Sequence, residues 1–588
     1  MQSEGTIVAD PTNARRLLVC AMFRDERIFQ GVAAYVSHDG GNHWDRTFES
    51  PTEQPAGDPT CAFGPDGTAY LTMMPMKHPS LTTMRLSLMR SVDGGLTWQT
   101  GGVTGGLDRD SLVVDGTSGP FRNRVYVHGD AFTYGTAGTL RNALELYASS
   151  DGGRTFGRPA QRVSMARGYI YGMGNSVVLS DGRWLTVAGE LNSYWEQSDS
   201  NVHALDMFGS LPEPANGRLM AVTSDDGGDS LNEPMPIGAW HMPKPLWHET
   251  SATPFVAVDP SDGPFRDRLY AVWPDGRFGG TAILLSYSTD RGHTWSPAML
   301  INDDRRPLPP APIPDHLLPS VAVNSAGVVA VTWLDRRDQP DNLGWRLRIR
   351  VSLDGGETFA PSAVASEAGA RFDGREHWPA LSSTFGGGTP AATGGPLRVL
   401  VFAAPHLFTP GDFAGLAADR DGGFHPYWID NRTGWNQAWT AQVNVVGKAM
   451  KNGASDLAAL DDLTALTTLE RLTSSYDAAT KTVTVTERLA NTSRQAVEGP
   501  FKIRLLTLDS DVAIVDAVGA SNGTTGIGAV WDVTSYVDGA RLTPGSTSRP
   551  FTLTFTLRDV RPLRPDFAGT LNNLLVRFLA RVLGRIAK

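Results

Sequence analysis

Three aspartate–arginine pairs with the same spacing are the clearest candidates for chemistry. Each follows an apolar run in the pattern Trp-x-Asp-x-Arg: Trp273-Pro-Asp275-Gly-Arg277, Trp333-Leu-Asp335-Arg-Arg337 and Trp428-Ile-Asp430-Asn-Arg432. Arginine presents a planar fork of donors that suits a carboxylate, and a neighbouring Asp can orient that fork. If the copies meet in space, they form a basin that binds an anion or a sugar. Alternatively, each pair braces only its own loop, and the pattern leaves both interpretations open.

A larger repeat must position these pairs. The pattern Ser-x-Asp-x-Gly-x-Thr-Trp/Phe, called here the Asp-box turn, occurs in five clear copies and one degenerate copy. The clear copies are 37–44, 91–98, 149–156, 288–295 and 352–359, and the degenerate copy is 224–231. Asp can accept hydrogen bonds from the backbone of its own turn, and Gly supplies a positive φ. We therefore interpret these aspartates as folding residues rather than catalytic ones.

Ahead of each Asp-box turn stand two apolar runs joined by a short turn. Residues 320–327 followed by 328–333 show this unit best, and residues 59–72 repeat it. Four strands per unit, repeated along the chain, predict an all-β fold with a β-propeller over residues 1–447. The last unit, 413–445, has no clean Asp-box turn. We count seven blades, and six stay open as the alternative if one unit is irregular.

In a four-stranded meander, the Asp-box turn shares a face with the turn between the first two strands. The other connections emerge on the opposite face, and they include the longest ones, 192–217, 301–318 and 364–412. Long loops on a rigid scaffold are common positions for functional sites. Further candidates at this face are Arg24, Asp25, Asp108, Arg109, Asp110, His128, Asp130, Tyr134, Glu190, Glu196, His316 and His377.

The repeated turns resemble those of the Asp-box, or BNR-repeat, proteins of the sialidase superfamily, over about residues 3–447. The resemblance implies arginines that hold a substrate carboxylate, a Tyr that attacks the anomeric carbon with help from a Glu, and an Asp that protonates the leaving group. The segment Gly5-Thr6-Ile7-Val8 lacks the Arg-Ile-Pro unit of that family, and with it one arginine. Carried onto this chain, the catalytic candidates are Asp25, Tyr134 and Glu190. The substrate-binding candidates are Arg24, Arg277, Arg337, Arg432, Asp275, Asp335 and Asp430.

These features predict a sialidase-like exo-glycoside hydrolase that acts on acidic glycans. The alternative is a non-catalytic propeller that binds glycan or protein partners, because one fold can host either. An enzyme needs a desolvated acid near the arginines, whereas a binder needs only shape and hydrogen bonds. We expect no cofactor. The Asp and His residues at the face with the long loops could bind Ca²⁺ or Zn²⁺, but no ligand spacing supports a metal site. The resemblance favours a secreted or cell-surface protein, although the first residues show no signal-peptide pattern.

The C-terminal part changes character after residue 447. Residues 448–465 are expected to form a linker, and 466–562 alternate as half-buried strands do, which predicts an immunoglobulin-like β-sandwich. We interpret the sandwich as a spacer rather than a carbohydrate-binding module. Residues 563–588 place Leu, Phe and Ile at helical spacing beside Arg577, Arg581 and Arg585. This predicts a cationic amphipathic helix that docks on its own protein, on a protein partner or on an anionic membrane surface.

Composition excludes several classes of protein. The 588 residues carry a net charge of -10, which argues against a nucleic-acid-binding surface. No run approaches the roughly 18 to 20 apolar residues of a membrane span. The 63 Gly and 39 Pro favour many short strands and tight turns. The two cysteines, Cys20 and Cys61, lie in apolar runs, and we expect both to be buried free thiols.

Overall fold

The computed structural model describes residues 2–25, 27, 30–75, 85–134, 140–163, 168–171, 174–192, 216–241, 243, 253–307, 311–371, 411, 414–434, 436–452, 455–510, 512–561 and 576–587. Nearly all regular structure in them is β-strand, which confirms the all-β prediction. Helix is limited there to the short 3₁₀ turns η2 (Leu457–Ala459), η3 (Thr534–Tyr536) and η4 (Asp538–Ala540). Among these residues, no helix is long and apolar enough to cross a membrane.

The chain divides into two compact units that are not simple halves of the sequence. The first unit contains Met1–Trp295, Asp315–Val351 and Ser362–Ala449. The second contains Ser296–Pro314, Ser352–Pro361 and Met450–Lys588. The last Asp-box turn, residues 352–359, therefore belongs to the same unit as the C-terminal strands.

The described residues of the first unit form seven sheets of antiparallel strands. The first two contain β1 (Gln2–Ala9), β2 (Leu17–Phe23), β3 (Gly31–Ser37) and β4 (Asp45–Glu49), then β5 (Ala56–Gly57), β6 (Cys61–Phe63), β7 (Ala69–Pro75), β8 (Ser87–Ser91) and β9 (Gln99–Val103). The third contains β10 (Asp108–Val114), β11 (Val125–Tyr134), β12 (Leu140–Ser149) and β13 (Ala160–Val163). The fourth contains β14 (Gly168–Tyr171), β15 (Ser176–Val178), β16 (Trp184–Asn192), β17 (Asn216–Ser224) and β18 (Met235–His241). The fifth contains β19 (Phe255–Val258), β20 (Leu269–Asp275) and β21 (Ala282–Ser288). The sixth contains β23 (His316–Val323), β24 (Val329–Asp335), β25 (Gly344–Ser352), β26 (Ala363–Val364) and β27 (Ala370–Arg371). The seventh contains β28 (Gly415–Ala418), β29 (Phe424–Asp430) and β30 (Gln437–Thr440).

The second long strand is fully buried in four of the described sheets. Every side chain of β2, β20, β24 and β29 is buried. A short strand that packs on both faces reads as a continuous apolar run, which is why the runs ahead of the Asp-box turns could be recognised in the sequence.

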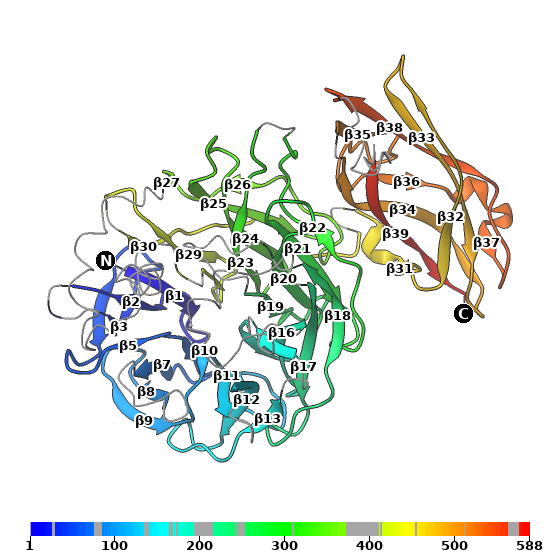
Figure 1. The fold of residues 1–588 in the computed structure, drawn as a ribbon. Coiled ribbons are helices and arrows are strands. Elements are labelled where there is room, and N and C mark those ends of the chain that lie inside the picture. Colours follow the sequence, from blue (N-terminus) through cyan, green and yellow to red (C-terminus); the bar gives the residue numbers. More distant parts are fainter. Residues whose placement is uncertain are drawn as a thin grey trace. The chain divides into compact units, whose positions relative to one another are not determined.

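The sheets of the first unit follow one another in a closed, propeller-like ring. Contacts join β1, β6, β10, β15, β19, β23 and β28 in that order, and β28 also contacts β1. In Figure 1 these sheets lie around a common centre. The Gln2 backbone N–H donates to the carbonyl of Asn436 at 2.9 Å, and the Gln2 side chain accepts from the Ala438 N–H at 2.8 Å. The first strand of the chain thus completes the ring beside the last sheet.

Each Asp-box turn is closed by its own side chains. In the second copy, the Gly95 N–H donates to Ser91 Oγ at 2.8 Å, and Ser91 Oγ donates to Asp93 Oδ1 at 2.6 Å. Asp93 Oδ1 also accepts the Thr97 N–H at 2.9 Å, and Thr97 Oγ1 donates to Asp93 Oδ2 at 2.6 Å. These bonds give partners to backbone N–H groups that the tight bend would otherwise leave without an acceptor. The carboxylate therefore stabilises its own turn.

The prediction of two free thiols is wrong. Cys20 of β2 and Cys61 of β6 form a disulfide, which leaves no free cysteine in the chain. The two strands belong to neighbouring sheets, so sheet packing brings together residues that are 41 positions apart. Two separate apolar runs carry no sequence signal of that contact.

The second unit is built around two packed sheets. One contains β31 (Asp461–Asp462), β39 (Arg577–Ile586), β34 (Val497–Asp509), β36 (Val530–Asp532) and β37 (Arg541–Leu542). The other contains β32 (Thr467–Asp477), β33 (Thr482–Asn491), β38 (Phe551–Arg558) and β35 (Ile514–Val518). The unit also includes β22 (Met299–Leu300). Phe501, Ile503, Leu553 and Phe555 lie in the core between the sheets.

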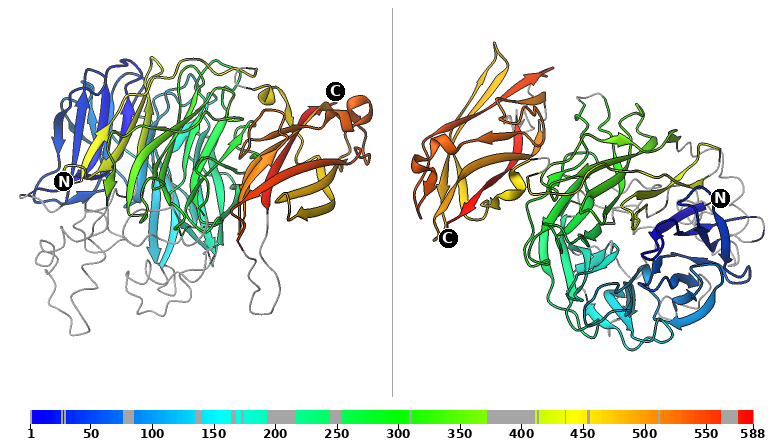
Figure 2. Two further views of the ribbon diagram at one scale, coloured as in Figure 1. Left: turned by 90° about the horizontal axis from the view of Figure 1, so that it is seen from above. Right: turned by 180° about the vertical axis from the view of Figure 1, so that it is seen from behind.

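The prediction of a C-terminal helix is wrong for the part that the structure describes. Residues 577–586 form strand β39, which pairs with β34 and β31, and it is the red strand among the orange ones in Figure 2. A spacing of four residues returns to the same face of a strand as well as of a helix, so the arginine stripe fits both. The docking roles suggested for a helix therefore do not apply to this segment. Residues 562–575 lie outside the described part.

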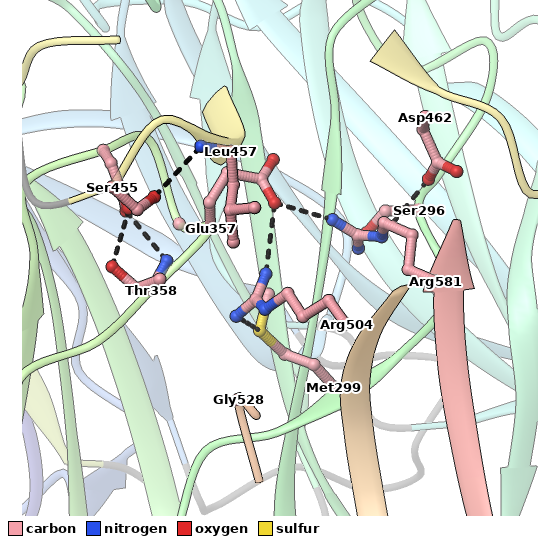
Figure 3. A network of polar contacts seen from close by, with 12 residues as sticks. Ser296, Met299, Glu357, Thr358, Ser455, Leu457, Asp462, Arg504, Gly528 and Arg581 are labelled. Atoms are coloured by element: carbon pink, nitrogen blue, oxygen red, sulfur yellow. Dashed lines mark hydrogen bonds and ion pairs between the residues drawn. The ribbon is translucent and has the colours of Figure 1, made fainter. Parts of the chain in front are cut away.

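A buried ionic network joins the last Asp-box turn to two strands of the second unit. Glu357 accepts from Arg504 Nη1 at 3.1 Å and from Arg581 Nη1 at 2.9 Å. Arg581 Nε also lies 3.3 Å from a carboxylate oxygen of Asp462 (Figure 3). Glu357, Arg504 and Arg581 are all fully buried, so the charges compensate one another instead of being solvated.

Candidate functional site

Strand pairing brings the predicted site residues to one edge of their sheets. Gln2 pairs with Phe23, Asp108 with Asp130, and His316 with Asp335. In each case the start of a first strand lies beside the end of a second strand. This edge, called here the exit edge, is opposite to the edge that carries the Asp-box turns.

All three Trp-x-Asp-x-Arg copies close on themselves at the exit edge. Asp335 Oδ2 accepts from Trp333 Nε1 at 2.6 Å, and Asp335 Oδ1 accepts from the Arg337 N–H and Nε, both at 2.9 Å. The other two copies share these donors, with distances of 2.7 to 3.3 Å for Asp275 and Asp430. The carboxylates are fully buried, whereas the guanidinium groups keep 13% to 26% of their surface. Each Asp thus fixes the plane of the Arg two residues later.

A fourth copy of this brace was missed in the sequence. Asp25, two residues after Phe23, accepts from the Arg27 N–H at 2.8 Å and from Arg27 Nε at 3.2 Å. The pattern is the same except that Phe replaces Trp and supplies no indole donor. The spacing aromatic-x-Asp-x-Arg would have identified it. Asp25 therefore braces its own loop, which differs from the role of free acid that the resemblance implies.

The remaining predicted residues are separate from these braces. Glu190 is buried on β16 and accepts from Arg218 Nε at 2.6 Å. His316 is buried and its Nδ1 lies 2.8 Å from the Thr281 carbonyl. Burial lowers the pKa of Arg24. Tyr134 is the last residue of β11, and its side chain, like Glu196 and His377, lies outside the described part.

The third sheet carries a bulge at the exit edge. The register of β10 with β11 shifts between Asp108 and Ser111, and Arg109 takes a φ of 53°. Gly129 lies opposite, and a Cβ there would stand 2.9 Å from Leu107 Cβ and 3.0 Å from the Asp108 carbonyl. A non-glycine residue with positive φ is strained backbone, and such strain often occurs at functional sites. The glycine opposite makes room for it.

Two buried aspartates flank this bulge. Burial raises the pKa of Asp110 to about 7, although hydrogen bonds from Thr72 at 2.5 Å and Thr60 at 3.1 Å oppose the rise. Burial also raises the pKa of Asp130 well above its usual range, the charge of Asp108 adds to the rise, and Arg109 opposes it.

Asp130 differs from Asp110 in its hydrogen bonding. It is 1% exposed, and within the described residues the Oδ1 atoms of Asp130 and Asp110 both lack a hydrogen-bond partner, whereas Asp110 Oδ2 accepts from two threonines. A buried carboxyl without a partner is costly and needs an explanation, since most buried polar groups are hydrogen-bonded. Asp130 pairs across the strands with the half-buried Asp108, so the exit edge places two acidic residues side by side.

Comparison with known proteins yields distant structural likenesses. No family model matches the chain, and no curated protein matches it. A Hadza microbial sialidase is 14% identical, covers 71% of this chain and 74% of its own, and has a TM-score of 0.37. A Penicillium chrysogenum alpha-L-arabinanase, solved with arabinobiose, is 12% identical, covers 66% and 93%, and scores 0.36. The intramolecular trans-sialidase from Ruminococcus gnavus is 12% identical, covers 76% and 94%, and scores 0.34. Scores at this level carry no argument, so the conclusions below depend on the residues of this chain.

Proposed function

We propose that the first unit is a seven-bladed β-propeller and acts as a sialidase-like exo-glycoside hydrolase on acidic glycans. The active site would lie at the exit edge, where the braced arginines and the Asp108–Asp130 pair are found. Hydrolysis of a glycosidic bond needs a group that can donate a proton to the leaving oxygen and a second group that stabilises or attacks the sugar.

The observation that carries this proposal is the state of Asp130. A carboxyl that stays protonated near neutral pH is the requirement that separates an enzyme of this kind from a binder. Burial of Asp130, and next the like charge of Asp108, raise the pKa of this carboxyl well above its usual range, which is the direction that a general acid needs. In this proposal Asp108, which is half-buried, meets the substrate, and Asp130 holds the proton that the pair shares.

The arginines of the exit edge would hold the acidic group of the substrate. Their planes are fixed before any ligand binds, because each is bonded to its own Asp. Fixed donors cost less entropy on binding than flexible ones. Tyr134 ends the same strand as Asp130, and Glu190 lies on the next sheet, so the Tyr–Glu pair implied by the family resemblance would act beside this acid.

A non-catalytic propeller that binds glycan or protein is the second candidate. One observation favours it: the four Asp–Arg pairs already satisfy each other, as structural braces do. A binder could use the same edge through loops and hydrogen bonds alone.

The deciding experiment is turnover of a fluorogenic sialoside, with a fluorogenic arabinofuranoside in parallel, by the purified chain. Asp130→Asn is expected to lower kcat by roughly 100-fold or more, as loss of a general acid does. Asp110→Asn is the matched control, because it is another buried acid of the same sheet but is bonded to Thr60 and Thr72. It should change kcat by only a few-fold.

Two further results bear on the proposal. Arg337→Ala should raise KM for the sialoside more than for the neutral arabinofuranoside, because only the first carries a carboxylate. No turnover of either substrate by the wild-type chain would reject the enzyme, and a glycan array would then test the binder.

A further inference from the structure

The second unit contains an open cavity of about 490 Å³ that the proposed function does not use. Three parts of this unit form its wall: Arg305, the end of β35 with the glycine-rich turn after it, and β38. A volume of this size is in the range of sites for small ligands. The polar side chains that line it are Arg305, Asp516, Thr524, Thr525, Thr556 and Arg558.

Its central feature is one carboxylate held between two guanidinium groups. Asp516 Oδ1 lies 3.0 Å from Arg305 Nη2, and Arg558 Nε donates to Asp516 Oδ2 at 2.8 Å. One oxygen is used for each arginine, so both forks have a defined orientation. The arginine side chains remain 56% and 51% exposed, while the Asp516 side chain is 16% exposed. The three residues together carry one net positive charge, and most of the exposed polar atoms are donors.

The glycine-rich turn, residues 519–523, forms one wall of the cavity. Gly519 and Gly523 have φ values of 73° and 71°, and a Cβ at either position would meet no atom within 4 Å. Packing therefore does not demand glycine here, but the left-handed backbone does. Val518, just before the turn, is 40% exposed and adds an apolar surface to the wall.

We propose that this cavity binds the oxyanion of an acidic saccharide, that is, a carboxylate or sulfate group with its sugar ring. The outward donors of Arg305 and Arg558 match an oxyanion, since guanidinium groups bind carboxylate and sulfate through paired N–H donors. The threonine hydroxyls suit the ring hydroxyls, and Val518 suits an apolar ring face. The second unit would then hold acidic glycans by itself, which goes beyond catalysis in the first unit.

The test is calorimetric titration of the full chain with N-acetylneuraminic acid, glucuronic acid, glucose and sodium sulfate. The wild-type chain should bind the two acidic sugars, with an affinity that falls as salt is raised, and should not bind glucose. Arg305→Ala with Arg558→Ala should weaken the binding of glucuronic acid at least tenfold, and should remove the N-acetylneuraminic acid site of the second unit while the proposed active site of the first unit keeps its own. Arg488→Ala is the matched control, because Arg488 is similarly exposed and paired with Glu470 at 2.6 Å elsewhere in the same unit. It should leave the affinity unchanged.

The other outcomes are equally decisive. Sulfate that binds as tightly as the sugars would overturn the saccharide assignment and leave an anion site. Glucose that binds equally, or binding unaffected in the double variant, would overturn the site. A thermal melt of the double variant establishes that it is folded. Turnover of a soluble fluorogenic sialoside should be the same in the double variant and wild type, so this proposal and the proposed function fail separately.

Discussion

The six Asp-box turns share their hydrogen bonds but not their surroundings. In five of them the residue that precedes the Thr, Ser or His is exposed: Asn42, Leu96, Arg154, Asp229 and His293. In the sixth turn the same position is Glu357, which is 3% exposed and bonded to Arg504 and Arg581 (Figure 3). The Asp of this turn also differs, because Asp354 Oδ2 accepts from Ser455 Oγ at 2.7 Å.

The difference shows that the turn fixes a backbone shape while one variable position decides its use. In both the second and the sixth copies, the Ser and Thr hydroxyls donate to the Asp and the Gly N–H donates to the Ser hydroxyl. They do not involve the variable side chain, which bonds back to the Asp carbonyl in Asn42 and Arg154 and contacts two arginines in Glu357. In the sixth turn this position is a glutamate that bonds to two buried arginines of the second unit, so the turn packs within that unit.

Removal of the Glu357 charge should give the largest effect. Glu357→Gln leaves two buried guanidinium groups with reduced compensation, and we expect the free energy of unfolding of the second unit to fall by about 3–5 kcal/mol. Urea denaturation followed by Trp fluorescence measures this. Asp229→Asn makes the same kind of change at the equivalent exposed position and should cost less than about 0.5 kcal/mol. Equal losses in the two variants would remove the distinction between the turns.

Replacing the whole network by apolar residues should reverse most of that loss. In Glu357→Leu with Arg504→Met and Arg581→Met no buried charge is left unpaired, so stability should return to within about 1–2 kcal/mol of wild type. The same urea experiment measures it. A triple variant as unstable as Glu357→Gln would mean that the network contributes specific geometry and not only charge compensation.

The aspartates of two turns should differ by a smaller amount. Asp93→Ala removes local bonds from an exposed turn and should cost about 1 kcal/mol. Asp354→Ala also leaves the Ser455 hydroxyl without its acceptor in a buried setting, so we expect about 2–3 kcal/mol. Thermal melts of the two variants at matched concentration compare them, with Ser455→Ala to isolate the extra bond. A larger loss for Asp93→Ala would contradict the comparison.

Acid should loosen the exposed turns, and this is the smallest effect. Burial tends to raise the pKa of Asp93, but hydrogen bonds from Ser91 and Thr97 lower it to about 2. A carboxyl whose pKa is lower in the folded state stabilises the protein above its unfolded pKa of about 3.9, and this contribution is lost as pH falls towards 2. Stability between pH 4 and 2 should thus fall less in Asp93→Asn than in wild type. Parallel curves in urea titrations would show that this carboxylate is not involved.

Features with a local cause could be predicted from the sequence. The Asp-box turns and the apolar runs specify their own bonds and burial, so the all-β fold and the exit edge follow from them. The brace around Asp275 was recognisable for the same reason, and the one at Asp25 was missed only because Phe23 replaces Trp. Features that depend on packing could not be predicted: the disulfide of Cys20, the burial of Glu357 and the burial of Asp130 all require neighbours distant in sequence. The prediction for residues 577–586 was wrong for another reason, because a spacing of four residues fits both a helix and a strand.

The hydrogen bonds between Gln2 and the segment around Asn436 have a consequence for synthesis of the chain. A ribosome makes β1 more than 400 residues before the final neighbour of that strand. At roughly 5–20 residues per second, β1 waits about 20 to 90 seconds with one flank uncovered. During that interval a strand edge is open to pairing with other nascent chains. We expect chaperones to bind β1 during this interval and to dissociate once residue 440 has emerged, when the ring of sheets can close.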